Sequence, residues 1–234
     1  MTLDKSTARV QEMFGEIAGR YDFLNRLLSL GIDRSWRKKT VKLVPSEGDA
    51  PILDVCTGTA DLALAYWRAA KGETAIVGTD FCQPMLDEAE AKKRKTGGSA
   101  NLWFLQGDGM ALPLASASVD VVTIAFGLRN MADRAHALRE MRRVLPPHGR
   151  LFVLEFSQPH PWFRPCYYFY LKRVLPRLAG IITGDRAAYE YLGGSIDQFP
   201  DRVRLSDELR AAGFSSVTAT AMTLGIVALH EAAV

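Results

Sequence analysis

Three short apolar runs are each followed by a segment with helical spacing, and this alternation constrains the fold more than any other feature of the sequence. The apolar runs cover 51–56, 74–79 and 119–126, and the helical segments cover 61–70, 84–95 and 135–145. Strands that alternate with helices form parallel sheets, because a helix must carry the chain back to the start of the next strand. The pattern therefore predicts an α/β fold.

Four further apolar pieces, at 102–105, 151–156, 216–220 and 225–230, complete a predicted sheet of seven strands. The last two follow one another closely and predict an antiparallel hairpin at the C-terminal edge of the sheet. We expect a doubly wound, mostly parallel, Rossmann-like sheet. A chain of 234 residues suits a single domain over 1–234 better than two domains.

Two segments fall outside this alternation. Residues 1–44 show helical spacing that is broken at Gly15, Gly19 and Gly31, which predicts an N-terminal helical cap. Residues 158–199 are rich in aromatic residues, proline and arginine, and we interpret them as an insertion on the substrate side.

Composition and charge argue against several classes of protein. The net charge of +3 is small and spread out, so we do not expect nucleic-acid binding. No run reaches the roughly 18 apolar residues of a membrane-spanning helix, and residues 1–11 lack a signal-peptide core. The three cysteines lack the spacing of a metal site or a disulfide framework. We expect a cytoplasmic protein, soluble or peripheral at the inner face of the membrane, and the sequence leaves a homo-oligomer open.

The turn after the first predicted strand has the composition of a ligand-binding turn. Gly58 lets the backbone approach a ligand, and Thr59 can hydrogen-bond it. Asp80 ends the second strand beside this turn, where its carboxylate can accept both hydroxyls of a ribose. The turn lacks the three glycines that cradle the pyrophosphate of NAD, so a ribose-bearing ligand without phosphates fits better. An ordinary strand-to-helix turn is the alternative.

A second polar turn, 106–109, follows the apolar run 102–105. In a sheet of this kind that position reaches adenine. The carboxylate of Asp108 can accept a hydrogen bond from the exocyclic amine of adenine. A polar surface turn is the alternative.

Several stretches resemble known families. The turn 54–61 resembles motif I of class I S-adenosylmethionine-dependent methyltransferases, with Ala60 where many members carry glycine. Residues 21–29 with Trp36, the stretch 126–130, and the stretch 143–151 continued by 154–157 resemble signatures of the ubiquinone and menaquinone biosynthesis C-methyltransferases. Two positions depart from these signatures: Asp33 replaces a usual histidine near the presumed substrate side, and 147–148 replaces a usual Pro-Gly pair.

The resemblance implies a cofactor, a substrate and site residues. The cofactor is S-adenosylmethionine. Its binding residues are Thr59, Asp80, Asp108, Gly109, Asp54 and Gly58, and Asp54 also organises the turn. The substrate implied is a prenylated quinol, demethylmenaquinol, because the stretch 56–61 looks more like menaquinone-pathway members. The alternatives are the same reaction on 2-polyprenyl-6-methoxy-1,4-benzoquinol, a methyltransferase for another small molecule, and a non-catalytic assembly protein.

Two residues are candidates for catalysis. Arg129 follows the fourth strand at the expected mouth of the site, where a guanidinium can stabilise a phenolate or polarise a water. A structural ion pair with Glu155 is its alternative role. Tyr21 can face the substrate or cofactor from the N-terminal helices, and core packing is its alternative.

The aromatic stretch 162–171 precedes three basic residues, Lys172, Arg173 and Arg177. This order suits an apolar channel for an isoprenoid tail with basic groups toward lipid headgroups. A buried helix with a solvated basic edge is the alternative.

Overall fold

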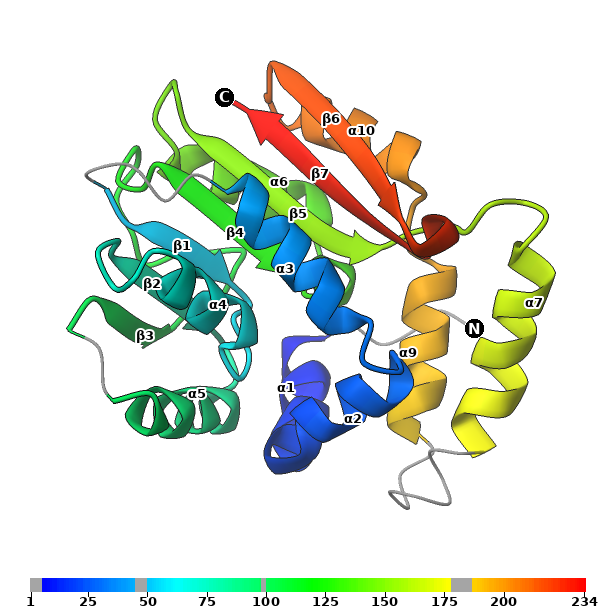
Figure 1. Cartoon of the computed structure of the whole chain (residues 1–234). Coiled ribbons are helices and arrows are strands. Elements are labelled where there is room, and N and C mark those ends of the chain that lie inside the picture. Colours follow the sequence, from blue (N-terminus) through cyan, green and yellow to red (C-terminus); the bar gives the residue numbers. More distant parts are fainter. Residues whose placement is uncertain (1–5, 45–49, 98–99, 178–186) are drawn as a thin grey trace.

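The computed structural model of the chain describes residues 6–44, 50–97, 100–177 and 187–234, and it confirms the predicted sheet. Seven strands lie in the order β3-β2-β1-β4-β5-β7-β6, and β7 runs antiparallel to both of its neighbours, β5 and β6, at one side of the sheet (Figure 1). The strands are β1 (Ile52–Val55), β2 (Ile76–Asp80), β3 (Leu102–Gln106), β4 (Val121–Ala125), β5 (Arg150–Phe156), β6 (Ser216–Met222) and β7 (Val227–Ala233).

Helices connect and flank the strands. They are α1 (Thr7–Ile17), η1 (Ala18–Arg20), α2 (Tyr21–Leu28), α3 (Asp33–Leu43), α4 (Asp61–Ala69), α5 (Gln83–Lys95), η2 (Leu128–Asn130), α6 (Arg134–Val144), α7 (Arg164–Phe169), η3 (Tyr170–Val174), α9 (Ala187–Asp197), α10 (Arg202–Ala211) and η4 (Thr223–Gly225). The three helices expected after β1, β2 and β4 are present as α4, α5 and α6.

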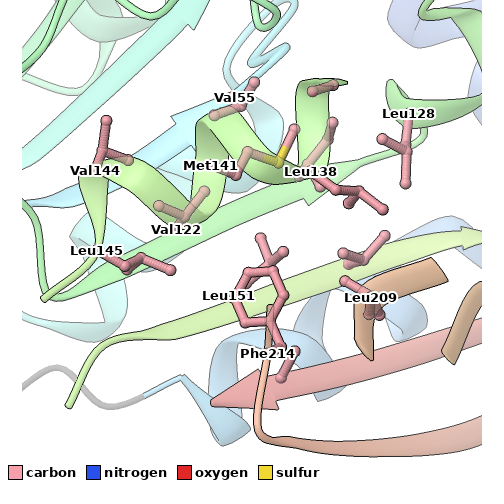
Figure 2. Packing of buried hydrophobic residues seen from close by; sticks show 14 of the residues in the cluster. Val55, Val122, Leu128, Leu138, Met141, Val144, Leu145, Leu151, Leu209 and Phe214 are labelled. Atoms are coloured by element: carbon pink, nitrogen blue, oxygen red, sulfur yellow. The ribbon is translucent and has the colours of Figure 1, made fainter. Parts of the chain in front are cut away.

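The central strands β1, β4 and β5 are buried on both faces, since their successive residues point to opposite sides and helices cover each side. In β5, Leu151 and Val153 join the core formed with α6 and α10, whereas Phe152 and Leu154 join the core formed with α3 and α4. Figure 2 shows the first of these cores, in which Leu151 faces side chains of α6 and α10. The loops that follow the carboxyl ends of the parallel strands carry most of the predicted site residues.

The N-terminal helices and the helices of the insertion meet beyond the carboxyl ends of the parallel strands (Figure 1). Leu24 of α2 packs in one cluster with Tyr167, Leu171, Leu175 and Ile196. Within the predicted insertion, residues 178–186 lie outside the described residues. Among the helices that the structure describes, none is both long and apolar enough to cross a bilayer.

Candidate active site

The loop after β1 adopts a backbone that glycine usually supplies. Cys56, Gly58 and Ala60 have φ of 53°, 55° and 64°, all in the left-handed region. A residue with a side chain costs roughly 1–2 kcal/mol in this conformation. This cost explains why many class I methyltransferases carry glycine at the position of Ala60. The Ala60 methyl is fully buried, and its packing offsets part of that cost.

Asp54 holds this loop from the end of β1. Its carboxylate accepts hydrogen bonds from Thr57 Oγ1 at 2.8 Å and from Thr123 Oγ1 at 2.7 Å. The side chain is only 1% exposed, and burial raises its pKa to about 6. The carboxylate therefore ties the loop to β4, as its predicted role of organising the turn requires.

The raised pKa of Asp54 gives a pH-dependent prediction. Because the folded state disfavours the ionised carboxylate, the fold gains stability from this group as the pH falls through about 6. Asp54→Asn removes the titration. The free energy of unfolding of the wild type, relative to the variant, is expected to rise by about 1 kcal/mol between about pH 8 and about pH 5. Urea unfolding of both proteins measures it, and a constant difference would contradict the assignment.

Asp80 joins the loops after β1 and β2. One carboxylate oxygen accepts from the backbone N–H of Gly58 at 2.9 Å, and the other accepts from that of Cys82 at 2.9 Å. Burial raises the pKa of this carboxyl group. An ionised carboxylate has about four acceptor sites, so these bonds orient Asp80 and leave capacity for the hydroxyls of a ribose.

Two small hollows, of about 40 and 30 Å³, lie along these loops. Both are lined by Tyr21, Cys56, Gly58, Ala125 and Phe126. Asp80 borders the first hollow, and Asp54 and Thr59 border the second. The structure thus brings most of the predicted cofactor residues to one place, together with Tyr21.

Asp108 and Gly109, which were predicted to bind the cofactor, also have structural roles in their own turn. The turn adjoins Asp80, because the N–H of Gly107 donates to the Asp80 carbonyl at 3.0 Å. Asp108 accepts from the N–H of Met110 at 2.8 Å, so it also stabilises its own turn. A Cβ atom on Gly109 would lie 2.5 Å from Met131 Cε and 3.0 Å from Val55 Cγ1, so this turn packs closely against both side chains. Adenine binding by this turn stays a prediction.

Thr59 makes contacts that the sequence did not suggest. Its hydroxyl donates to Asp22 Oδ1 at 2.6 Å and accepts from Lys92 Nζ at 2.9 Å. Lys92 also contacts Asp61 Oδ1 at 2.5 Å. These partners lie on different helices and are far apart in sequence, although the resemblance in 21–29 already singled out the stretch that contains Asp22.

A larger apolar cavity of about 290 Å³ lies between the N-terminal helices and the insertion. Its walls come from α2, α3, the ends of β4 and β5, α7, η3 and α9: Tyr21, Asn25, Ser29, Leu30, Ile32, Asp33, Trp36, Arg37, Phe126, Arg129, Phe156, Phe163, Cys166, Tyr167, Tyr170, Leu171, Leu175, Leu192, Ile196, Thr223 and Ile226. Tyr21 and Phe126 line this cavity and both hollows. These two side chains therefore separate the predicted cofactor residues from the apolar cavity.

Arg129 is a buried cation on the wall of this cavity. Its Nη1 lies 3.1 Å from Glu155 Oε1, and its backbone N–H donates to Glu155 Oε2 at 3.2 Å. The guanidinium lies 5.2 Å from the ring centre of Phe156. The ion pair with Glu155, the alternative role, is therefore present, and it holds the guanidinium at the cavity wall.

Two polar side chains complete the boundary. Burial raises the pKa of Tyr21, so its phenol stays protonated at neutral pH and can donate a hydrogen bond. Asp33 lines the cavity, as expected for the substrate side, where it accepts from Ser29 Oγ at 2.7 Å and pairs with Arg37.

Comparisons with known proteins agree on the class. The model of the ubiE/COQ5 methyltransferase family matches residues 1–234. A demethylmenaquinone methyltransferase of Thermus thermophilus is 47% identical over 93% of this chain and 98% of its own length. The ubiquinone/menaquinone biosynthesis C-methyltransferase UbiE of Shewanella frigidimarina is 39% identical over 97% of this chain and 91% of its own length.

Solved structures match the fold at lower identity. A S-adenosylmethionine-dependent methyltransferase of Thermotoga maritima, described as a possible histamine N-methyltransferase, has a TM-score of 0.67 and 17% identity, with 95% of this chain and 98% of that chain covered.

Proposed function

This chain belongs to the ubiE/COQ5 methyltransferase family, and on that premise we propose that it methylates a ring carbon of demethylmenaquinol, a naphthoquinol with an isoprenoid tail. S-adenosylmethionine is the methyl donor. The observation that carries the substrate is the apolar cavity of about 290 Å³, which has a buried guanidinium on its wall and meets the cofactor residues at Tyr21 and Phe126.

The residues present fit this cofactor. Asp80 is oriented by two backbone N–H groups and retains acceptor capacity, which suits a ribose diol. Gly58 has a left-handed backbone and no side chain, so the loop can approach a ligand closely. Bound there, S-adenosylmethionine supplies an electrophilic methyl group on a sulfonium sulfur.

The residues around the cavity suit the chemistry of a quinol ring. When the quinol loses a phenolic proton to a water molecule, a ring carbon becomes nucleophilic, and Arg129 stabilises the resulting phenolate from its fixed position. The phenol of Tyr21 donates a hydrogen bond at the boundary between the two sites. The cavity excludes bulk water from the ring, which strengthens both interactions.

The apolar walls from the insertion suit the isoprenoid tail, and Leu192→Trp tests this role. The substitution adds volume at a half-buried wall residue. The KM for a long-tailed quinol is expected to rise at least about tenfold, because the lost space forces the tail partly into water. A quinol without a tail should keep its KM, and Val203→Trp on the exposed face of α10 is the control. Equal effects on both quinols would contradict a tail channel.

The rim of the cavity suits contact with an anionic membrane surface. Leu30, Trp162 and Phe169 are 79%, 70% and 64% exposed. Leu30 lines the cavity, and the chain neighbours of the other two, Phe163 and Tyr170, line it as well. Exposed basic residues lie on the elements that supply walls of the cavity: Arg34, Lys38, Lys39 and Lys42 on α3, and Arg164, Lys172, Arg173 and Arg177 in the segment 164–177, with Lys172 paired to Asp197. A tail in the bilayer would then enter the cavity directly.

Co-sedimentation with vesicles tests this contact without substrate or cofactor. The protein is expected to bind vesicles of phosphatidylcholine and phosphatidylglycerol. Trp162→Ser should weaken this binding at least about fivefold, since burying a large apolar side chain contributes about 1.5 kcal/mol or more. Trp103→Ser, at the exposed edge strand β3, is the matched control. Equal binding by both variants would contradict the assigned face.

A further inference from the structure

A cluster of charged side chains joins the N-terminal helices to the loop after β1. Lys92 of α5 contacts Asp61 Oδ1 at 2.5 Å and Thr59 Oγ1 at 2.9 Å, and it pairs with Asp22 of α2. Asp22 in turn accepts from Thr59 at 2.6 Å. Arg37 of α3 extends the cluster, since it lies 3.5 Å from Asp61 Oδ2. One ammonium group thus contacts the cap, the loop and the first residue of α4.

The cluster is shielded from solvent. The side chains of Lys92, Asp22 and Asp61 are 22%, 23% and 25% exposed. Charges in such positions are screened less than surface pairs, and breaking one of them leaves partners without a counter-charge. The contacts therefore influence how firmly α2 is held against the loop.

The N-terminal helices that this cluster contacts also line the proposed cofactor site. Phe14 of α1 and Tyr21 of α2 line the hollow beside Gly58 and Asp80. That hollow holds about 40 Å³, whereas ligand sites usually measure about 300–1,000 Å³. A ligand of nucleoside size enters only if the cap or its side chains move.

We propose that Lys92 is a positioning residue that latches the cap over the cofactor loop through Asp22 and Thr59. The proposal rests on S-adenosylmethionine as the cofactor. In the free protein the latch holds the cap closed and slows entry. Once the cofactor lies beneath the cap, the same contacts hold Thr59 and α2 in place and slow release.

Lys92→Met tests the latch, and Lys93→Met is the matched control. Lys93 is the next residue on the same helix and pairs only with Glu90 among the ion pairs of the described residues. Stopped-flow binding of S-adenosylmethionine to folded protein gives both rate constants. Lys92→Met is expected to raise the association rate at least about threefold and the dissociation rate at least about tenfold. Lys93→Met should change each less than about twofold.

A lesion that only disturbs the fold would lower the association rate, so an unchanged or lower rate overturns the proposal. Asp22→Asn should also raise both rate constants. In the double variant the two rate constants should be close to those of either single variant, because the two residues act as one unit. Additive effects would also overturn it.

Hydrogen exchange of the ligand-free protein separates this proposal from the cofactor assignment. Lys92→Met is expected to exchange faster than the wild type in α1 and α2 and at the same rate in α10. Equal exchange of α1 and α2 in the wild type and in Lys92→Met would contradict the latch even if the cofactor assignment holds. If the wild type fails to bind S-adenosylmethionine while Lys92→Met still exchanges faster than the wild type in α1 and α2, the cofactor assignment is overturned and the latch on the cap stays supported.

Discussion

Asp80→Ala is expected to weaken binding of S-adenosylmethionine at least about a hundredfold. Hydrogen bonds to a charged group contribute about 1.5–3 kcal/mol each, and the ribose offers two hydroxyls to this carboxylate. The substitution also removes the acceptor for the backbone N–H groups of Gly58 and Cys82, so the loop loses its hold on the end of β2. Isothermal titration calorimetry measures the affinity directly.

Asp87→Ala is the control for this experiment. Asp87 lies on α5, is exposed and accepts only from Gln83 among the hydrogen bonds described for it. Its affinity for the cofactor should match that of the wild type. If Asp80→Ala also binds within about threefold of the wild type, the ribose is not held at the end of β2.

Arg129→Met is expected to lower kcat about 10²–10³-fold, the usual cost of losing one preorganised group that stabilises developing charge. Affinity for S-adenosylmethionine should change little, because Arg129 lines the apolar cavity rather than the two hollows by the loop. The variant also leaves Glu155, only 1% exposed, without its ion-pair partner, so a loss of stability accompanies the loss of activity.

The double variant Arg129→Met with Glu155→Gln separates the two effects. Removing both charges should recover much of the stability that the single variant loses, since no uncompensated charge remains in the core. If Arg129 stabilises the phenolate, kcat stays low in the double variant. Recovery of kcat together with stability would show that the ion pair only supports the fold.

The sheet could be predicted because its central strands, β1, β4 and β5, are buried on both faces and stand out as apolar runs between turns. The residues 151–156 carry this pattern clearly, and they form β5 at the centre of both cores. Helix α10 was missed because its segment 202–211 is mostly polar, and its buried face rests on Leu205 and Leu209 alone among its apolar residues. Two leucines four residues apart are a weak signal beside seven strands.

The site could be predicted where its residues lie at the carboxyl ends of strands, as Asp54 and Asp80 do, or in the turn that follows, as Gly58 does. The contacts of Lys92 could not, because the partners Thr59 and Asp22 are 33 and 70 positions away in sequence and only packing brings their helices together. An apolar channel was predicted from the aromatic stretch 162–171, and Tyr21 and Asp33 were the residues of the N-terminal helices that were assigned to the substrate side. The other wall of the cavity comes from α2 and α3, and their approach to the insertion depends on the whole fold.

The most direct test of methyl transfer to a prenylated quinol is mass spectrometry of the reaction product. Purified protein is incubated with S-adenosylmethionine and either reduced demethylmenaquinol or 2-polyprenyl-6-methoxy-1,4-benzoquinol. We expect demethylmenaquinol to gain one methyl group on a ring carbon, with much slower conversion of the benzoquinol. Faster conversion of the benzoquinol would show that the benzoquinol, and not the naphthoquinol, is the preferred substrate. The absence of a methylated product from both quinols would contradict the proposed function.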